Sequence, residues 1–326
     1  MTTTADARRM TDASVTTVDV SVLVPAKDEA ENLPLFLQLC DETFRAQKHR
    51  YEVIVVDDGS TDATAGVLEQ LTARYPFLRT IHHRSQRGIA DALRSGYLAA
   101  RSDLLVFYPA DLQFKPEDIP RLVAPIFAGE ADTVTGFKQG HYEKAFVSRI
   151  YNALSRALFN VPVKDLNNVK AYRREIMDAQ PARPDWHRYM IVLAAAQGYT
   201  VTEIPIPLYP RHAGKSKFGI GRIPIGVLDM LSVWFELKFA QKPLLAFGML
   251  GAALFAVGFV AGVIALGVYV LQGAGVRAVW TLIQTCLILG SVFFATGLLG
   301  EQVAVLRSEQ RELRRLLAER QAPRDG

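Results

Sequence analysis

Two stretches near the carboxyl end of the chain, residues 243–276 and 278–300, contain no charged side chain. A helix of about 20 apolar residues is long enough to cross the roughly 30 Å hydrocarbon core of a bilayer. Both stretches are apolar on every face and longer than a typical buried core helix. They predict two transmembrane helices within residues 243–302, with two core helices of a soluble protein as the alternative.

Positive charge flanks these stretches unevenly. The segment that joins them, residues 272–276, is uncharged, whereas Lys238 and Lys242 precede the first stretch. Further arginines lie in the tail, residues 303–326: Arg307, Arg311, Arg314, Arg315 and Arg320. Because basic flanks stay in the cytoplasm, both ends of the hairpin and the amino-terminal region are expected at the cytoplasmic face of the inner membrane. The net charge of +4 includes no basic stripe of the kind that binds nucleic acid, and the tail is expected to lie on anionic lipid.

The two cysteines, Cys40 and Cys286, do not suggest a disulfide framework, since one falls in a predicted cytosolic helix and the other in a predicted span. Residues 1–17 contain no apolar core of the kind that a signal peptide needs. We expect them to form a disordered lead-in.

The amino-terminal region alternates between apolar, β-branched runs and segments with helical spacing. Strands are predicted at residues 18–24, 51–56, 79–83, 103–108 and 132–137, and helices at 29–47, 61–75, 89–101 and 116–128. This alternation predicts an α/β fold with a mostly parallel sheet and helices on both faces. Such sheets bind ligands beyond the carboxyl ends of their strands.

The pattern changes after residue 142. We expect an amphipathic helix at 143–159, an irregular segment at 163–173, a helix at 186–197 and a strand at 200–206. A basic loop that contains glycine follows at 211–222. Residues 223–239 predict a helix that lies in the bilayer interface, with a packed core helix as the alternative.

Carboxylates gather where the predicted strands end. Asp57 and Asp58 stand together before Gly59, and Asp62 follows at the start of the next helix, where its charge would complement the helix dipole. The two adjacent carboxylates are suited to accept hydrogen bonds from a base or a ribose. Asp111 and Gln113 follow another strand and offer two hard oxygen donors that suit Mg²⁺ or Mn²⁺, although a turn aspartate is the alternative at Asp111.

Basic residues fall near the predicted loops at the same side of the sheet. They are Arg84, Arg87, Lys138, Lys144, Arg211, Lys215 and Lys217, and about half of such a set is normally solvated surface charge. The segment 211–217 is more specific. Its glycine, its serine and its three cations suit a phosphate at the bilayer surface, just before the predicted interfacial helix.

Seven segments in this order resemble the family 2 glycosyltransferases of GT-A type, in the branch that acts on polyprenyl phosphates. That branch includes dolichol-phosphate mannosyltransferase and the undecaprenyl-phosphate glucosyl- and aminoarabinosyl-transferases. The segments are residues 24–29, 56–62, 87–92, 110–113, 165–172, 211–218 and 297–301. The resemblance runs from about residue 18 to residue 306, which is nearly the whole chain.

The resemblance implies a cytoplasmic catalytic domain at 18–222, followed by an interfacial helix at 223–242, the hairpin and the basic tail. It implies inverting sugar transfer from a nucleotide diphosphate to a polyprenyl phosphate, with Mg²⁺ or Mn²⁺. The nucleotide-sugar residues would be Pro25, Asp28, Glu29, Asp57, Asp58, Arg87 and Asp111, and the metal ligands Asp111 and Gln113. The lipid-phosphate residues would be Lys138, Lys144, Ser148, Arg211, Ser216 and Lys217. Asp111 and Asp165 would be catalytic, although a turn cap is an equal alternative for Asp165. Self-association into a homo-oligomer is left open.

Two positions depart from the family pattern. Pro109 replaces the first carboxylate of the usual Asp-x-Asp, so that one metal ligand is missing, and Lys27 stands where an Asn is common. Among the alternatives, a processive polysaccharide synthase would carry a Gln-x-x-Arg-Trp motif, which this sequence lacks. A nucleotidyltransferase would carry a glycine-rich loop where this chain has Pro-Ala-Lys-Asp-Glu at residues 25–29. A non-catalytic membrane scaffold is the third alternative, and only Pro109 favours it.

Overall fold

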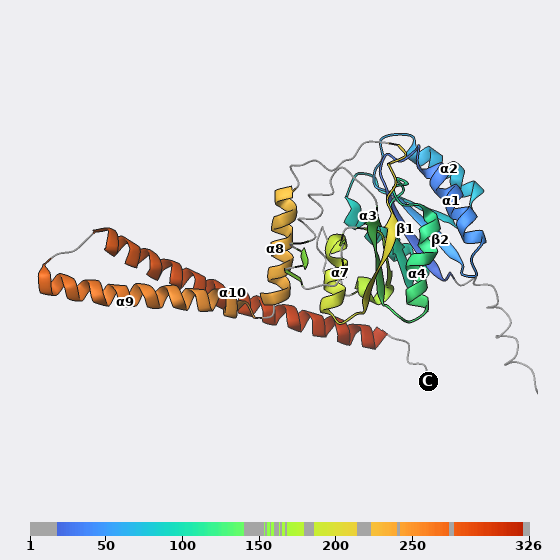
Figure 1. Cartoon of the computed structure of the whole chain (residues 1–326). Helices are drawn as coiled ribbons and strands as arrows, with labels where there is room; N and C mark the ends of the chain where they lie inside the picture. Colours follow the sequence, from blue (N-terminus) through green and yellow to red (C-terminus); the bar gives the residue numbers. More distant parts are fainter. Residues whose placement is uncertain are drawn as a thin grey trace, which may run out of the picture. The chain divides into compact units, whose positions relative to one another are not determined.

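In the computed structural model the chain forms two compact units, Met1–Pro224 and Ile225–Gly326 (Figure 1). The residues that the structure describes are 18–139, 153, 155–156, 158–159, 163, 165–166, 168–178, 186–213, 223–239, 242–273 and 277–321. The predicted helix at 143–159 therefore lies almost entirely outside them.

The first unit is built on a seven-stranded sheet with the order β3-β2-β1-β4-β6-β5-β7. The strands are β1 (Val20–Ala26), β2 (Tyr51–Asp57), β3 (Leu78–His82), β4 (Leu104–Phe107), β5 (Thr133–Gln139), β6 (Lys170–Arg173) and β7 (Val201–Pro207). Every neighbouring pair is parallel except those of β6, which runs antiparallel to β4 and β5. The central strands β1 and β2 are rich in valine and are buried almost throughout, as expected for strands covered on both faces.

Helices cover both faces of the sheet, each over its own apolar core. One core contains residues of α1 (Leu33–Arg45), α2 (Thr64–Arg74) and α4 (Ile119–Phe127). The other contains residues of α3 (Ile89–Ala99), α6 (Arg174–Asp178) and α7 (Trp186–Ala196). A short 3-10 helix, η1 (Pro116–Asp118), precedes α4. The mostly parallel sheet with flanking helices was predicted from the alternation and is confirmed.

The irregular segment predicted at 163–173 is wrong for its last four residues, which form β6. Lys170 pairs with Phe107 of β4 and with Thr135 of β5, so the strand fills the gap between two distant segments. A strand of four residues with a basic residue at each end has no local apolar pattern. Its conformation comes from the hydrogen bonds to both neighbours, which no short window of sequence contains.

The elements described from residue 223 onward are helical: α8 (Ile223–Phe239), the π-helical turn η3 (Leu244–Gly248), α9 (Met249–Gln272) and α10 (Arg277–Gln321). Two stretches, Leu244–Gln272 and Val279–Gln310, are long and apolar enough to cross a membrane. Only 6% and 17% of their most apolar windows are buried, whereas a core helix of a soluble protein would be mostly buried. This exposure supports the predicted spans over the alternative of core helices.

Glycines allow α9 and α10 to pack closely side by side (Figure 1). A Cβ atom on Gly251 would lie 2.5 Å from the backbone nitrogen of Phe294 and 2.7 Å from the carbonyl oxygen of Gly290. Such contacts matter in a bilayer, because helix association there depends on close packing rather than on the hydrophobic effect. Near the same end of the contact, Leu244 N donates to the Glu301 carboxylate at 3.4 Å.

Candidate active site

The loops that follow β1 and β2 are joined by a network of hydrogen bonds. Asp28 N donates to Ser60 Oγ at 2.8 Å, and the Asp28 carboxylate accepts from Thr61 N at 2.8 Å. Glu29 N donates to Thr64 Oγ1 at 2.9 Å. Asp28 has a positive φ of 52°, a left-handed conformation that aspartate tolerates better than most residues. The network therefore holds the two predicted nucleotide-binding segments against each other.

Asp57 and Asp58 have different hydrogen-bond partners within this network, and both side chains are almost fully buried. Asp57 accepts from Ser60 N at 2.9 Å and lies 3.2 Å from His82 Nδ1. Asp58 accepts from Arg87 N at 2.8 Å and from Gly88 N at 2.7 Å. It thereby fixes the turn that leads into α3. The predicted contacts of both carboxylates with a nucleotide stay a prediction.

The pKa of Asp58 is lowered although the side chain is buried. Burial raises the pKa, but the hydrogen bonds with His83, Arg87 N and Gly88 N outweigh it. His83 Nδ1 lies 2.8 Å from the Asp58 carboxylate, and its Nε2 lies 2.9 Å from Ser95 Oγ on α3. The carboxylate is therefore ionised and firmly held.

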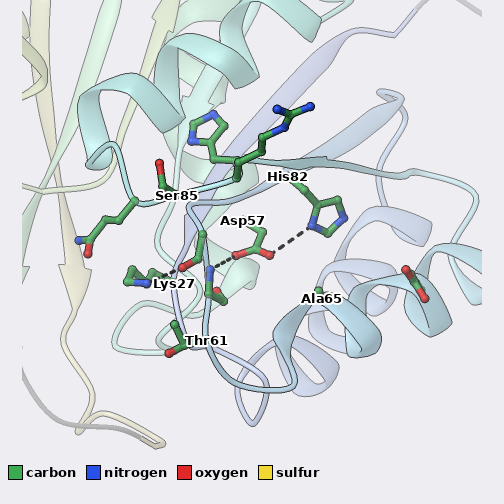
Figure 2. A pocket seen from close by; sticks show the side chains of 12 residues that line it. Lys27, Asp57, Thr61, Ala65, His82 and Ser85 are labelled. Carbon is green, nitrogen blue, oxygen red and sulfur yellow. Dashed lines mark hydrogen bonds and ion pairs between the residues drawn. The ribbon is translucent and has the colours of Figure 1, made fainter.

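A cavity of about 640 Å³ opens beside these loops, between the start of α2 and the end of β3 (Figure 2). Its volume lies in the usual range for small-molecule sites. The lining residues are Lys27, Asp57, Gly59, Ser60, Thr61, Ala65, Glu69, His82, His83, Arg84, Ser85 and Gln86. Of the predicted nucleotide-sugar residues, Asp57 lines it. Lys27, which stands where the family commonly has an Asn, also lines it and donates to Gly59 O at 2.6 Å.

Asp111 and Gln113 lie in the loop after β4, on either side of Leu112. Leu112 has a positive φ of 57°, and Gln113 N donates to the Asp111 carboxylate at 3.2 Å, which closes a tight turn. Burial raises the pKa of Asp111, and Arg211 and the Gln113 amide offset this only in part. Unlike Asp58, this carboxylate pays a net desolvation cost when it is ionised.

Arg211 contacts both predicted metal ligands. Its guanidinium lies 2.9 Å from Asp111 Oδ2 and 3.5 Å from the side-chain oxygen of Gln113. The backbone continues the contact, because Tyr209 N donates to Gln113 O at 3.0 Å. Arg211 was predicted to serve the lipid phosphate, so the structure brings together residues that the sequence had assigned to two different ligands.

The oxygens of Asp111 and Gln113 fit a divalent cation. They converge on one positive group, the Arg211 guanidinium, and hard oxygen donors are the ligands that Mg²⁺ and Mn²⁺ prefer. In the part of the chain that the structure describes, no three His, Cys, Asp or Glu side chains gather into a metal cluster. A cation here would therefore complete its shell with phosphate oxygens and water, as Mg²⁺ commonly does.

A second cluster of charged side chains lies around Asp165. Lys138 Nζ lies 3.3 Å from its carboxylate, so the predicted catalytic aspartate and a predicted phosphate-binding lysine are paired. Lys170 of β6 is buried nearby, and its ammonium donates to Leu166 O at 3.0 Å and to His187 O at 2.8 Å. Burial lowers the pKa of Lys170 to about 7. Lys170 was not among the predicted site residues, although a lysine flanked by Val169, Ala171 and Tyr172 is a signal for a buried charged group.

The other predicted residues are distributed as follows. Pro25 lies within β1 opposite Val56, and Arg87 precedes α3. Lys144, Ser148, Ser216 and Lys217 lie outside the described residues.

Residues 21–179 match the model of the family described as glycosyl transferase family 2. The chain is 29% identical over 307 residues to the undecaprenyl-phosphate 4-deoxy-4-formamido-L-arabinose transferase of Pseudomonas fluorescens strain Pf0-1, covering 92% of this chain and 89% of the relative. It is 29% identical over 322 residues to the dodecaprenyl-phosphate galacturonate synthase of Rhizobium johnstonii, covering 93% of each.

Among solved structures, the glucosyl-3-phosphoglycerate synthase of Mycobacterium tuberculosis, in complex with Mn²⁺, uridine diphosphate and glucosyl-3-phosphoglycerate, resembles this chain with a TM-score of 0.55. The two are 20% identical, and the match covers 67% of this chain and 80% of the synthase. The likeness confirms the predicted fold, and the family and the relatives confirm the resemblance that the motifs carried.

Proposed function

We infer that this chain, which carries a glycosyl transferase family 2 domain, transfers a sugar from a nucleotide diphosphate to a polyprenyl phosphate. The observation that carries this inference is the length of the two matches. Each covers more than 90% of this chain and therefore includes the apolar hairpin as well as the catalytic domain. The two relatives name different sugars but the same kind of lipid acceptor, so the acceptor class is what they support.

We propose that Asp111 and Gln113 hold a divalent cation with the donor. The cation, when bound, would neutralise charge that develops on the leaving diphosphate. Asp111 supplies the one carboxylate at this point, because Pro109 stands in place of the other. The loops after β1 and β2, already joined through Asp28 and Ser60, would form the wall for the nucleoside.

The acceptor would attack through its own phosphate oxygen. That oxygen forms a bond to the sugar C1 while the bond from C1 to the diphosphate breaks, so the anomeric centre inverts and nucleoside diphosphate departs. A phosphate monoester has a second pKa near 6 and is therefore already ionised at neutral pH. No strong base is needed, and Asp165, paired with Lys138 at 3.3 Å, is suited to position groups rather than to accept a proton.

We further propose that the transfer takes place at the cytoplasmic face of the inner membrane, with both termini in the cytoplasm. The basic flanks of the hairpin support this orientation. Cysteine labelling in intact cells, in a variant without Cys40 and Cys286, tests it. A cysteine placed within residues 272–276 should react with an impermeant reagent. Reaction of a cysteine within residues 308–320 instead would overturn the orientation.

The activity itself is tested with the purified full-length protein. UDP- and GDP-sugars are screened, and release of nucleoside diphosphate is measured with and without undecaprenyl phosphate. We expect release that depends on the lipid for at least one donor, with a new lipid-linked sugar as product. A membrane scaffold would give no release with any donor, and that outcome would overturn the proposal.

A further inference from the structure

The segment from Tyr209 to Ala213 follows β7 and is attached to the Asp111 loop at several points. Tyr209 N donates to Gln113 O at 3.0 Å, and Lys115 Nζ lies 4.4 Å above the Tyr209 ring. At the far end, Asn32 Nδ2 lies 3.5 Å from Ala213 O, which is the limit for a hydrogen bond. Among the described residues, the segment thus has a short hydrogen bond at Tyr209, and beyond Arg211 it has contacts of 3.5 Å, from Asn32 Nδ2 to Ala213 O and from His212 N to Asp111 O.

Arg211 of this segment forms an ion pair with Asp111 at 2.9 Å. The guanidinium sits on Asp111 Oδ2 and also reaches the Gln113 oxygen, so it occupies the place where these two donors would hold a cation. A divalent cation bound at Asp111 Oδ2 would lie close to the guanidinium that contacts the same oxygen, and the two positive charges would repel each other. The two cations therefore compete for this oxygen.

We propose that Arg211 is a displaceable counter-ion of the metal site: a divalent cation takes Asp111, and the released Arg211 becomes available to the acceptor phosphate. The identity of the two ligands rests on the proposed function. The exchange itself rests on the geometry around Asp111. It makes binding ordered, with the cation and donor first and the lipid phosphate second, because Arg211 is engaged until the cation arrives.

The exchange predicts that Arg211 weakens cation binding in the free protein. Removing the Arg211 guanidinium, which competes for Asp111, should tighten cation binding roughly tenfold, because a charge-assisted hydrogen bond contributes free energy of at least that size. A residue that merely supported the site would have the opposite effect when removed, since its loss would loosen the loop. The sign of the change thus separates the two roles.

The first experiment measures Mn²⁺ binding to the full-length protein in detergent, without nucleotide, from the electron paramagnetic resonance signal of free Mn²⁺. Arg211→Gln should bind Mn²⁺ about tenfold more tightly than the unmodified protein. Arg121→Gln is the matched control, since Arg121 pairs with Asp118 away from this site, and should leave the affinity unchanged. Asp111→Asn should weaken binding. Unchanged or weaker binding in Arg211→Gln, or unchanged binding in Asp111→Asn, overturns the proposal.

A second measurement keeps the Arg211 side chain in place. Ala213→Cys, in a protein without Cys40 and Cys286, reports the exposure of the segment through its rate of reaction with a maleimide. Mn²⁺ with uridine diphosphate should raise that rate severalfold, and an unchanged rate contradicts displacement. If the unmodified protein transfers sugar but Arg211→Gln leaves the Mn²⁺ affinity unchanged, the exchange at Asp111 is wrong and the proposed function stands. If Arg211→Gln binds Mn²⁺ more tightly but the unmodified protein transfers sugar to no lipid, the proposed function is wrong and the exchange stands.

Discussion

Asp58 follows β2 and Asp111 lies in the loop after β4, and both are buried carboxylates beyond the carboxyl ends of their strands. The groups that hold them are of different types. Two backbone amides and His83 hold Asp58, and they lower its pKa in spite of burial. A guanidinium from a distant segment holds Asp111, and its pKa is raised. Backbone donors are in place as soon as the chain folds, whereas a side-chain cation can be exchanged for another cation.

The surroundings of Asp58 keep a fixed geometry, whereas those of Asp111 allow one cation to be exchanged for another. Around Asp58, the carboxylate is held by backbone amides and by His83, so a substitution there removes fixed hydrogen bonds. Around Asp111, the partner is replaceable, which suits a site that must admit a cation and a substrate in turn. Substitutions on the two sides should therefore affect stability and activity in opposite proportions.

The largest effect is expected from Asp111→Asn, which should lower turnover a hundredfold or more, because one preorganised charge next to the leaving group is lost. The melting temperature should not fall. The raised pKa means that the ionised carboxylate costs the folded state free energy above the ordinary pKa of aspartate, and the neutral amide does not carry this cost. Steady-state kinetics and thermal unfolding of the same preparation check both parts. Full activity of the variant, or of the unmodified protein in excess EDTA, would refute the metal role.

Arg211→Ala should have the next largest effect. Loss of one charge-assisted contact to a bound phosphate costs about 1.5–3 kcal/mol, so the Michaelis constant for the lipid should rise roughly ten- to a hundredfold, or turnover should fall. Nucleotide binding should not weaken, since Arg211 competes with the cation rather than assisting it. Calorimetric titration with nucleoside diphosphate and Mn²⁺ decides the matter. A tenfold loss of nucleotide affinity would show that this residue serves the donor.

Asp58→Asn tests the hydrogen bonds around Asp58 through the free energy of unfolding. Its amide nitrogen would face a backbone donor of Arg87 or Gly88, and an unsatisfied buried donor costs about 1–3 kcal/mol of unfolding free energy. Because the pKa of Asp58 is lowered, its stabilising contribution is present above the ordinary pKa and is lost as the pH falls through the lowered value. Denaturation at pH 7 and near pH 3 should therefore show a variant whose deficit shrinks in acid. An equal deficit at both values would contradict this account of Asp58.

The smallest effect is expected from His82→Ala. The ring lies 3.2 Å from the Asp57 carboxylate, but 42% of its side chain is exposed, and solvent-exposed pairs contribute less than about 1 kcal/mol. Thermal unfolding beside Asp58→Asn is the measurement. A loss as large as that of the aspartate variant would mean that side-chain pairing, rather than the backbone amides, organises this side of the sheet.

Several features could be predicted from local sequence because their causes are local. Strand and helix periods placed nearly all the elements of the first unit, and the absence of charge in residues 243–276 predicted the first span. Asp62 was expected to serve the start of α2, and it accepts a hydrogen bond from Thr64 N at 3.0 Å. The carboxyl-end rule for parallel strands also placed Asp57 and Asp58 at one edge of the sheet.

What the sequence alone determined was thus most of the elements, the two long apolar helices and the chemical character of the loops, since these follow from side-chain periodicity and charge within short windows. Only the tertiary structure decided which groups meet. Lys170 becomes a buried lysine with a lowered pKa because β6 inserts between β4 and β5. Arg211 reaches Asp111, one hundred positions away in the sequence, because β7 ends near the loop that follows β4. The partners of a charge depend on chain segments that are distant in sequence, and burial then determines how strongly those partners act.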